Sequence, residues 1–190
     1  HEDAIATYDK LAQRFPQSQL ARRAATEKAM VYNSNNDYSN AIKAYKAIIE
    51  KYPHSEEARI ALEDLKNIYI EQGNVSEYAA YVSGINGIQK VNSNELDTLA
   101  YTAAERFYSK RELGKAEIKF REYLENFPQG AFRLNGHYYL GLLQYNNNNY
   151  DAALKNLKAV TEYPDNRFNE EALVLVGEIH YNKKEYANSI

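Results

Sequence analysis

The side chains best suited to catalysis in this sequence are histidines, and they are too scattered to act together. His54, His137 and His180 have no i, i+4 partner that could complete a metal site, and zinc sites need ligands at close, defined spacing. The sequence has no cysteine, which excludes disulfides, thiol catalysis and cysteine-bound zinc. We therefore predict no metal site and expect His180 to be a half-buried ring in a helical core.

The paired carboxylates Glu56–Glu57 and Glu170–Glu171 each lie in the first turn of a predicted helix, where acidic residues compensate the helix dipole. There is no serine elbow, glycine-rich phosphate loop or aspartate-rich metal loop, and the GINGI segment at 84–88 lacks the Lys-Ser/Thr of a phosphate cradle. We predict no catalytic residues and no cofactor, so the protein is expected not to be an enzyme.

Tyrosine is the abundant functional side chain, with 18 copies, and many lie near asparagines. Tyrosine offers a large contact area with few rotors and a hydroxyl, and asparagine can pair both ways with a peptide backbone. This chemistry suits binding of a protein or peptide. The net charge of −3 indicates no nucleic-acid partner, and no apolar run approaches the roughly 18 residues of a membrane span.

The elements that carry these side chains repeat along the chain. The stretch 37–53 predicts an amphipathic helix in which Ala41, Tyr45 and Ile48 share one face and Pro53 ends the helix. The same order of small, aromatic or aliphatic, and proline residues recurs as Ala4, Tyr8, Leu11, Pro16, as Ala116, Phe120, Tyr123, Pro128, and as Ala153, Leu157, Val160, Pro164. A truncated copy begins at 185–187. The period of about 37 residues is typical of a repeated supersecondary unit.

Each unit has a first helix ahead of this marker helix, with Ser18, Ser55 and Ser93 as predicted N-caps. Small residues near the middle of the two helices should let them approach closely: Ala29, Ala104, Gly141 and Gly177 in the first, and Ala41, Ala116, Ala153 and Ser189 in the second. We predict an all-α, right-handed superhelical solenoid of about nine helices in antiparallel hairpins. It would be one domain over 1–190, in units 1–16, 17–53, 54–91, 92–128, 129–164 and 165–190, and a fragment of a longer chain.

This pattern resembles the tetratricopeptide repeat. Its markers are clearest at Gly141, Tyr145, Tyr150, Ala153, Leu157 and Pro164. The period and the closing FPQS and YPHS look like the longer-loop variety of bacterial cell-envelope proteins, such as the lipoprotein of outer-membrane barrel assembly and the periplasmic coordinator of envelope constriction. The Tyr/Asn-rich composition is similar to large repeat proteins of Bacteroidetes. The resemblance implies a periplasmic or outer-membrane-associated location.

In that family the first helices line a concave groove, so the resemblance implies a set of groove residues. These are Arg23, Thr26, Met30 and Asn33; Glu63, Asn67 and Ile70; Tyr101, Glu105 and Tyr108; Asn135, Tyr138, Leu142 and Tyr145; and Val174, Glu178, Tyr181 and Asn182. The alternative for Tyr108, Tyr145 and Tyr181 is that they pack against the next hairpin.

One unit departs from the pattern. In 75–91, Tyr78 stands where the second helix of other units has a small residue. Lys66 lies in the preceding helix, at a place where other units carry Ala or Gly. Gly84 and Gly87 interrupt the helix. We expect a kink, a shortened helix or a local opening around 83–92. Its role is either a degenerate repeat that bends the solenoid, or a hinge or docking loop.

The sequence thus favours a non-catalytic scaffold that binds a peptide segment or partner subunit through the concave face. The alternative is a purely architectural spacer or self-assembly segment of a larger envelope protein, which could associate through its open solenoid ends. A lectin-like or enzymatic role has only the abundance of Tyr and Asn behind it.

Overall fold

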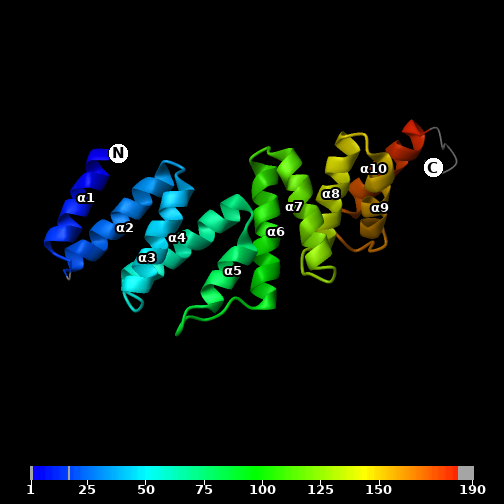
Figure 1. Cartoon of the computed structure of the whole chain (residues 1–190). Helices are drawn as coiled ribbons and strands as arrows, with labels where there is room; N and C mark the ends of the chain where they lie inside the picture. The colour runs from blue at the N-terminus through cyan, green and yellow to red at the C-terminus, as the bar shows by residue number, and fades with distance from the viewer. Residues whose placement is uncertain (1, 17, 184–190) are drawn as a thin grey trace. The chain divides into compact units, whose positions relative to one another are not determined.

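The computed structural model describes residues 2–16 and 18–183 and is helical throughout (Figure 1). Within these residues there is no strand, and no helix is long and apolar enough to cross a membrane. The ten helices are α1 (Glu2–Arg14), α2 (Gln19–Ser34), α3 (Tyr38–Lys51), α4 (Glu56–Gln72), α5 (Val75–Ser83), α6 (Ser93–Ser109), α7 (Leu113–Asn126), α8 (Arg133–Asn146), α9 (Tyr150–Thr161) and α10 (Asn169–Asn182). The predicted all-α class is confirmed, with ten helices in place of about nine.

The chain divides into two compact units, which are described separately. Unit 1 spans His1–Tyr78 and unit 2 spans Ala79–Ile190, so the division falls inside α5. The single domain and the repeat boundaries expected from the sequence stay predictions.

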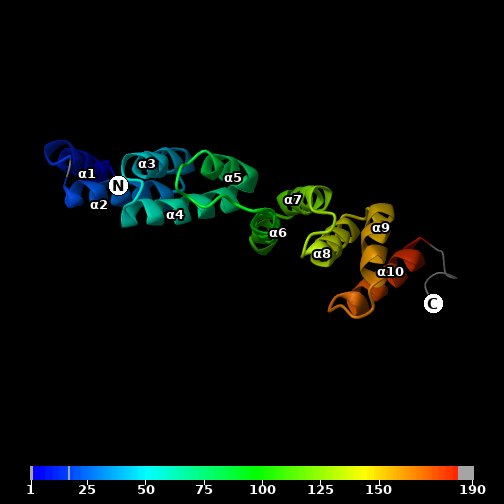
Figure 2. The same ribbon diagram turned by 90° about the horizontal axis from the view of Figure 1, so that it is seen from below.

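Within each unit, sequential helices pack as antiparallel neighbours. In unit 1, α2 contacts α1, α3 and α4, so α2 and α4 form one layer and α1 and α3 the other (Figure 2). In unit 2 the sequential contacts run from α6 to α10, and α8 also contacts α10. We call the side formed by α2 and α4, or by α6, α8 and α10, the A face. The side formed by α1 and α3, or by α7 and α9, is the B face.

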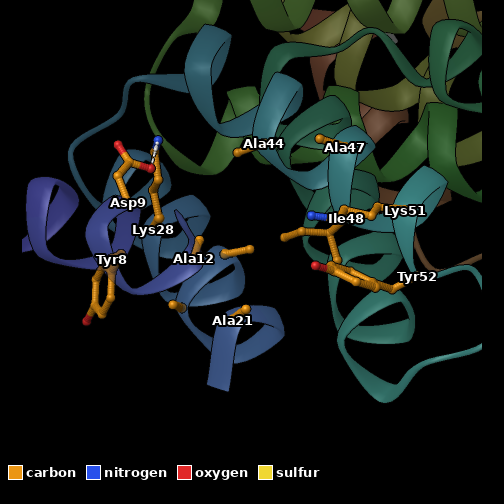
Figure 3. A pocket seen from close by; sticks show the side chains of 12 residues that line it. Tyr8, Asp9, Ala12, Ala21, Lys28, Ala44, Ala47, Ile48, Lys51 and Tyr52 are labelled. Carbon is orange, nitrogen blue, oxygen red and sulfur yellow. Dashed lines mark hydrogen bonds and ion pairs between the residues drawn. The ribbon is translucent and has the colours of Figure 1, made fainter. Parts of the chain in front are cut away.

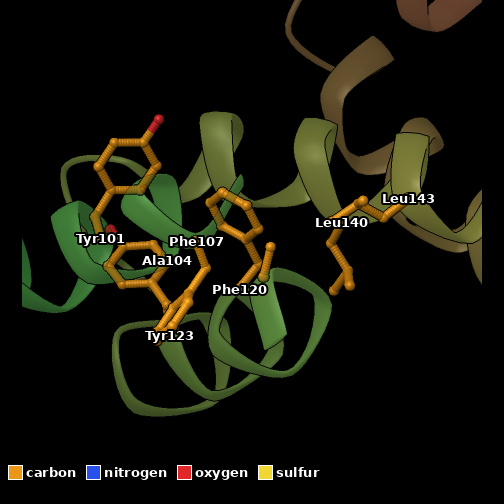
Figure 4. Packing of buried hydrophobic residues seen from close by; sticks show 8 residues of the cluster. Tyr101, Ala104, Phe107, Phe120, Tyr123, Leu140 and Leu143 are labelled. Atoms are coloured by element: carbon orange, nitrogen blue, oxygen red, sulfur yellow. The ribbon is translucent and has the colours of Figure 1, made fainter. Parts of the chain in front are cut away.

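The helices of a hairpin approach closely where small residues face each other. Ala41, Ala116 and Ala153 are completely buried, as the sequence predicted for this position. A Cβ atom on Gly141 would lie 2.8 Å from Cγ of Leu157, so only glycine fits there without a shift. The expected partner of Gly177, Ser189, lies outside the described residues. Around the α6–α7 approach a core gathers from three helices of unit 2 (Figure 4): Tyr101, Ala104, Phe107, Ala116, Phe120, Tyr123, Leu140 and Leu143.

All four described hairpin turns share one backbone conformation. A residue one or two places after the end of the first helix has a positive φ: 59° at Asn36, 72° at Gly73, 63° at Arg111 and 59° at Asn148. The next amide then bonds back five residues, as in Asp37 N to Tyr32 O at 2.9 Å. This is a Schellman motif, which satisfies the last carbonyls of the helix.

Helix starts agree with the sequence at two of three predicted caps. The hydroxyl of Ser18 accepts from Ala21 N at 3.0 Å, and that of Ser55 accepts from Ala58 N at 3.1 Å. Ser93 was the wrong residue for α6, because the side chain of Asn92 accepts from Glu95 N at 2.9 Å and Ser93 is already helical. Asparagine and serine are both good N-cap residues, and in the structure the helix begins one residue earlier than predicted, so Asn92 is the cap.

The irregular stretch 75–91 contains a shortened helix, as expected. α5 ends at Ser83 after 9 residues, and Gly87 has a φ of 79°. Tyr78, at the position that is small in other units, is buried, and its ring lies 6.2 Å from that of Tyr69. The hairpin therefore accommodates the large residue by aromatic packing.

A buried polar cluster ties three segments of unit 2 together. The Tyr123 hydroxyl donates to Oδ1 of Asp97 at 2.6 Å and accepts from Phe132 N at 3.0 Å. The other oxygen of Asp97 accepts from Ala131 N at 2.7 Å. The α7–α8 turn crosses this cluster at Gly130, where an added Cβ would lie 2.5 Å from the Tyr123 hydroxyl and 2.7 Å from Asp97 Oδ1. The hydrogen bonds thus require a residue without a side chain at this point.

We predict that Gly130→Ala lowers the free energy of unfolding by about 2 kcal/mol, because the methyl group overpacks the cluster. Thermal and urea denaturation followed by circular dichroism would measure it. The matched control is Gly114→Ala, where an added Cβ meets nothing within 4 Å. Equal effects of the two substitutions would contradict the close approach.

Of the four turn residues with a positive φ, Arg111 is the one that is neither Gly nor Asn. A positive φ is unfavourable for a residue with a long side chain. We predict that Arg111→Gly raises the free energy of unfolding by about 0.5–1 kcal/mol. Lys110→Gly, where φ is −78°, is the control and should not stabilise. A destabilised Arg111→Gly variant in urea titration would contradict the prediction.

Candidate functional site

The A face of unit 1 contains a hollow of about 280 Å³ between α2 and α4. From α2 it is lined by Arg23, Thr26 and Met30, three of the predicted groove residues, together with Gln19 and Glu27. The α4 side contributes Glu56, Glu57 and Ile60. Arg23 and Met30 are exposed, so their side chains are accessible to a partner. The structure thus brings sequence-predicted residues to an open depression.

Both charge signs are present around this hollow. The Arg59 guanidinium bonds to Glu56 and lowers the pKa of that carboxyl group. Arg22 lies 3.6 Å from Glu57, measured from Nε to Oε2. Arg23 makes no ion pair with any other residue that the structure describes. Glu27, one turn further along α2, also forms no ion pair among the described residues. An incoming segment would therefore meet one unpaired charge of each sign, Arg23 and Glu27, beside the apolar side chains of Met30 and Ile60.

Four more predicted residues lie on the A-face helices of unit 1. On α4, Glu63 is exposed, whereas Ile70 is buried and so belongs to the core. Asn67 is exposed on α4, whereas Asn33 is half-buried on α2. Neither lines the hollow. The geometry therefore groups Arg23, Thr26 and Met30 and leaves the asparagines outside that group.

On the A face of unit 2, the tyrosines predicted to line the groove are largely packed. Tyr101 and Tyr138, at equivalent places in α6 and α8, are 4% and 8% exposed. The Tyr101 ring stacks on Phe132 with centroids 4.5 Å apart, and the Tyr138 ring stacks on Phe168 at 4.4 Å. Each ring therefore packs on the residue that leads into the next first helix.

Their hydroxyl groups also point to the next repeat. Asn135 donates to the Tyr101 hydroxyl at 3.3 Å, and the Tyr138 hydroxyl donates to Glu171. Tyr145 donates to Oε2 of Glu178 at 2.7 Å, which raises the pKa of Tyr145. These bonds join first helices of successive repeats, α6 to α8 and α8 to α10. Asn135 and Glu178 thus hold tyrosines in place as well as lying on the A face.

The remaining predicted residues of unit 2 divide between packing and exposure. The Tyr108 ring lies 4.8 Å from that of Tyr139 in α8, which confirms the packing alternative for this residue. Tyr181 is 64% exposed. Glu105 and Glu178 are also exposed. Accessible candidates on this A face are therefore the two glutamates, Val174, Tyr181 and Asn182, with Tyr145 in part.

Sequence reasoning missed Phe132 and Phe168, which complete the stacks, and Asp97, which anchors the buried cluster. A signal existed for the phenylalanines, because PQGAF and PDNRF both place one four residues after the proline. Asp97 had no such signal, since an acid in the first turns of a helix is ordinarily a dipole-compensating residue.

His137 and His180 lie in packed positions of the described helices. Within residues 2–16 and 18–183 no group of three His, Cys, Asp or Glu residues could hold a metal ion. His137 Nδ1 lies 2.9 Å from Oδ1 of Asn156, inside the α8–α9 hairpin. His180 is buried, more fully than expected. Both are accounted for by packing, and the absence of catalysis stays a prediction.

The sequence also matches a known protein family, in agreement with the repeat pattern and the helical fold. Residues 1–56 and 138–190, more than half of the chain, match the family described as tetratricopeptide repeat. The chain belongs to the tetratricopeptide-repeat family. The two matched stretches fall in different units, so each unit carries sequence of tetratricopeptide-repeat type.

Among solved structures, this tetratricopeptide-repeat chain is similar to YrrB, described as a TPR protein with an unusual peptide-binding site. The two are 15% identical, the match covers 96% of this chain and 87% of YrrB, and the TM-score is 0.45. No curated protein matches the chain.

The packed tyrosines of this tetratricopeptide-repeat protein predict sensitivity to alkali. Burial raises the pKa of Tyr45, Tyr101, Tyr123 and Tyr138 above the ordinary value. In the unfolded chain these groups ionise near pH 10. Above that pH the folded state binds more protons than the unfolded state, so stability is complete below about pH 10 and falls as pH rises.

We predict that Tyr138→Phe flattens this fall by about 1.4 kcal/mol per pH unit, because one proton fewer separates the two states. Urea titrations at a series of pH values above 9, with tyrosinate absorbance read in parallel, would measure the slope. A variant with an unchanged slope would show that Tyr138 ionises normally in the folded chain.

Proposed function

We propose that this chain is a non-catalytic interaction scaffold that binds an extended segment of a partner protein on the A face. The observation that carries the proposal is the hollow between α2 and α4, where Arg23, Thr26 and Met30 meet Ile60. It offers an apolar floor beside an uncompensated guanidinium group, which can pair with a carboxylate or a backbone carbonyl.

The size of the hollow supports binding of a chain segment. At about 280 Å³ it is at the small end of the range for ligand pockets, and it is open along the helices. A helical-repeat layer also presents neighbouring first helices side by side, so that an extended segment could continue across them. Asn67, exposed on α4, would lie further along such a path.

Burial of Tyr101 and Tyr138 changes which residues a test should alter. Removing either ring would open a cavity between α6 and α8 or between α8 and α10 and cost about 3 kcal/mol or more. Loss of binding in those variants would then report on folding. Exposed Arg23 and Met30 can be changed without that penalty.

The test is selection of linear peptides from a random library on the purified chain, followed by affinity measurement with variants. We predict that Arg23→Glu and Met30→Ala each weaken a selected peptide by about tenfold, the equivalent of ~1.4 kcal/mol. The control is Lys43→Glu, an exposed substitution on α3 that should leave affinity unchanged. Equal affinity for all variants would place binding elsewhere.

The architectural alternative has one observation in its favour. In unit 2 the rings of Tyr101 and Tyr138 stack on residues of the same chain, and their hydroxyls form hydrogen bonds within it. These groups therefore hold repeats together and are not free to bind a partner. If no peptide can be selected and ultracentrifugation shows concentration-dependent association, a spacer or self-assembling segment becomes the better reading. A bacterial cell-envelope location is proposed from the sequence resemblance alone.

A further inference from the structure

A second hollow, of about 230 Å³, opens on the B face of unit 1, away from the A face. Its floor is α2 and its walls are α1 and α3. Six of its twelve lining residues are alanines: Ala12 from α1, Ala21, Ala24 and Ala25 from α2, and Ala44 and Ala47 from α3. Figure 3 shows the Asp9–Lys28 pair on one side and Ile48, Lys51 and Tyr52 on the other.

The hollow exists because this repeat carries small residues where the equivalent place in unit 2 is filled. Ala12 corresponds in the repeat to Leu124, whose Cδ2 lies 3.0 Å from the Cβ position of Gly136. Ala25 and Ala44 correspond to His137 and Asn156, which bond across the α8–α9 hairpin at 2.9 Å. In unit 2, larger side chains therefore stand at the positions where alanines border the hollow of unit 1.

The volume fits one side chain. An apolar cavity of about 150 Å³ accepts benzene, so about 230 Å³ accommodates a phenyl or branched aliphatic group with room for its stem. The lining is mostly apolar, with alanine methyl groups and Ile48, and its polar side chains are Tyr8, the Asp9–Lys28 pair, Lys51 and Tyr52. The occupant must therefore be apolar where it enters the hollow.

The charged residues at the rim determine which partner group can lie beside the apolar side chain in the hollow. Asp9 and Lys28 neutralise each other, with Nζ 2.7 Å from Oδ1. Lys51 forms no ion pair with any residue in the described ranges, and its ammonium lies 5.2 Å from the centre of the Tyr52 ring. One cation at the mouth of an apolar hollow is complementary to an anion that flanks an apolar side chain.

We propose that the B face of unit 1 is a second docking site, which takes one aromatic or branched aliphatic side chain of an acidic partner segment and pairs its flanking carboxylate with Lys51. The site opens on the opposite layer from the hollow between α2 and α4. A partner here would not compete with one on the A face, so the scaffold can hold two segments at once.

The probe is hydrocinnamate, a phenyl ring joined to a carboxylate by two methylenes, titrated into the full chain labelled with ¹³C at alanine methyl groups. We expect millimolar binding with shifts confined to the methyls of the lining alanines, Ala12, Ala21, Ala24, Ala25, Ala44 and Ala47. Phenylpropylamine, the matched cation, should bind more weakly by about three- to fivefold. Lys51→Met should remove that preference by weakening hydrocinnamate to the same degree.

Two variants fill the hollow and control for each other. Ala12→Leu introduces the side chain that unit 2 carries, and Ala47→Leu fills from the exposed edge of α3. Each should abolish the methyl shifts while circular dichroism stays unchanged, and Arg23→Glu on the A face should leave them intact. Unaltered hydrocinnamate binding in both filled variants, equal binding of the amine, or shifts spread over both units would overturn the proposal.

Discussion

The distance between the two helices of a hairpin is set where a small residue of one helix leaves room for a side chain of the other, and the other contacts of the repeat depend on it. At Gly141 the partner Leu157 occupies the space where a Cβ atom would stand, so the helix axes can come close. Only at this separation do the aromatic and aliphatic residues further along, such as Phe120 and Leu140, meet across the layers. A larger residue would separate the helices and open the core on either side.

Once the helices are close, buried tyrosines give the repeats their specificity. Their rings fill space between layers, and their hydroxyls must find partners because an unbonded polar group is costly in an apolar interior. Asp97, on another helix, accepts a hydrogen bond from Tyr123, and Glu171, in the next repeat, accepts one from Tyr138. Six of the tyrosines that the structure describes are buried. Part of the tyrosine content therefore serves packing, and the surface open to partners is smaller than the composition indicates.

Periodicity was sufficient to predict the helices and the close-packed small residues, because these depend on local spacing. The shortened α5 was one of three outcomes that Gly84 and Gly87 led us to expect. Burial of Tyr101 and Tyr138 could not be predicted, since it depends on Phe132 and Phe168 arriving from a turn. The hollow among the alanines was equally hidden. Alanine is an ordinary helix residue, and its lack of volume matters only when helices from two repeats face each other.

The hydroxyl bonds between first helices have a consequence for how such repeats can be rearranged. Donor and acceptor lie on different repeats, Tyr138 on one and Glu171 on the next. A repeat is therefore not interchangeable with any other: it must follow a neighbour with the matching group. Thr26, at the place of Tyr138, bonds instead to Arg22 O within its own helix. Duplication or exchange of modules between the two halves would leave tyrosine hydroxyls without acceptors, so order along the chain is itself encoded in these pairs.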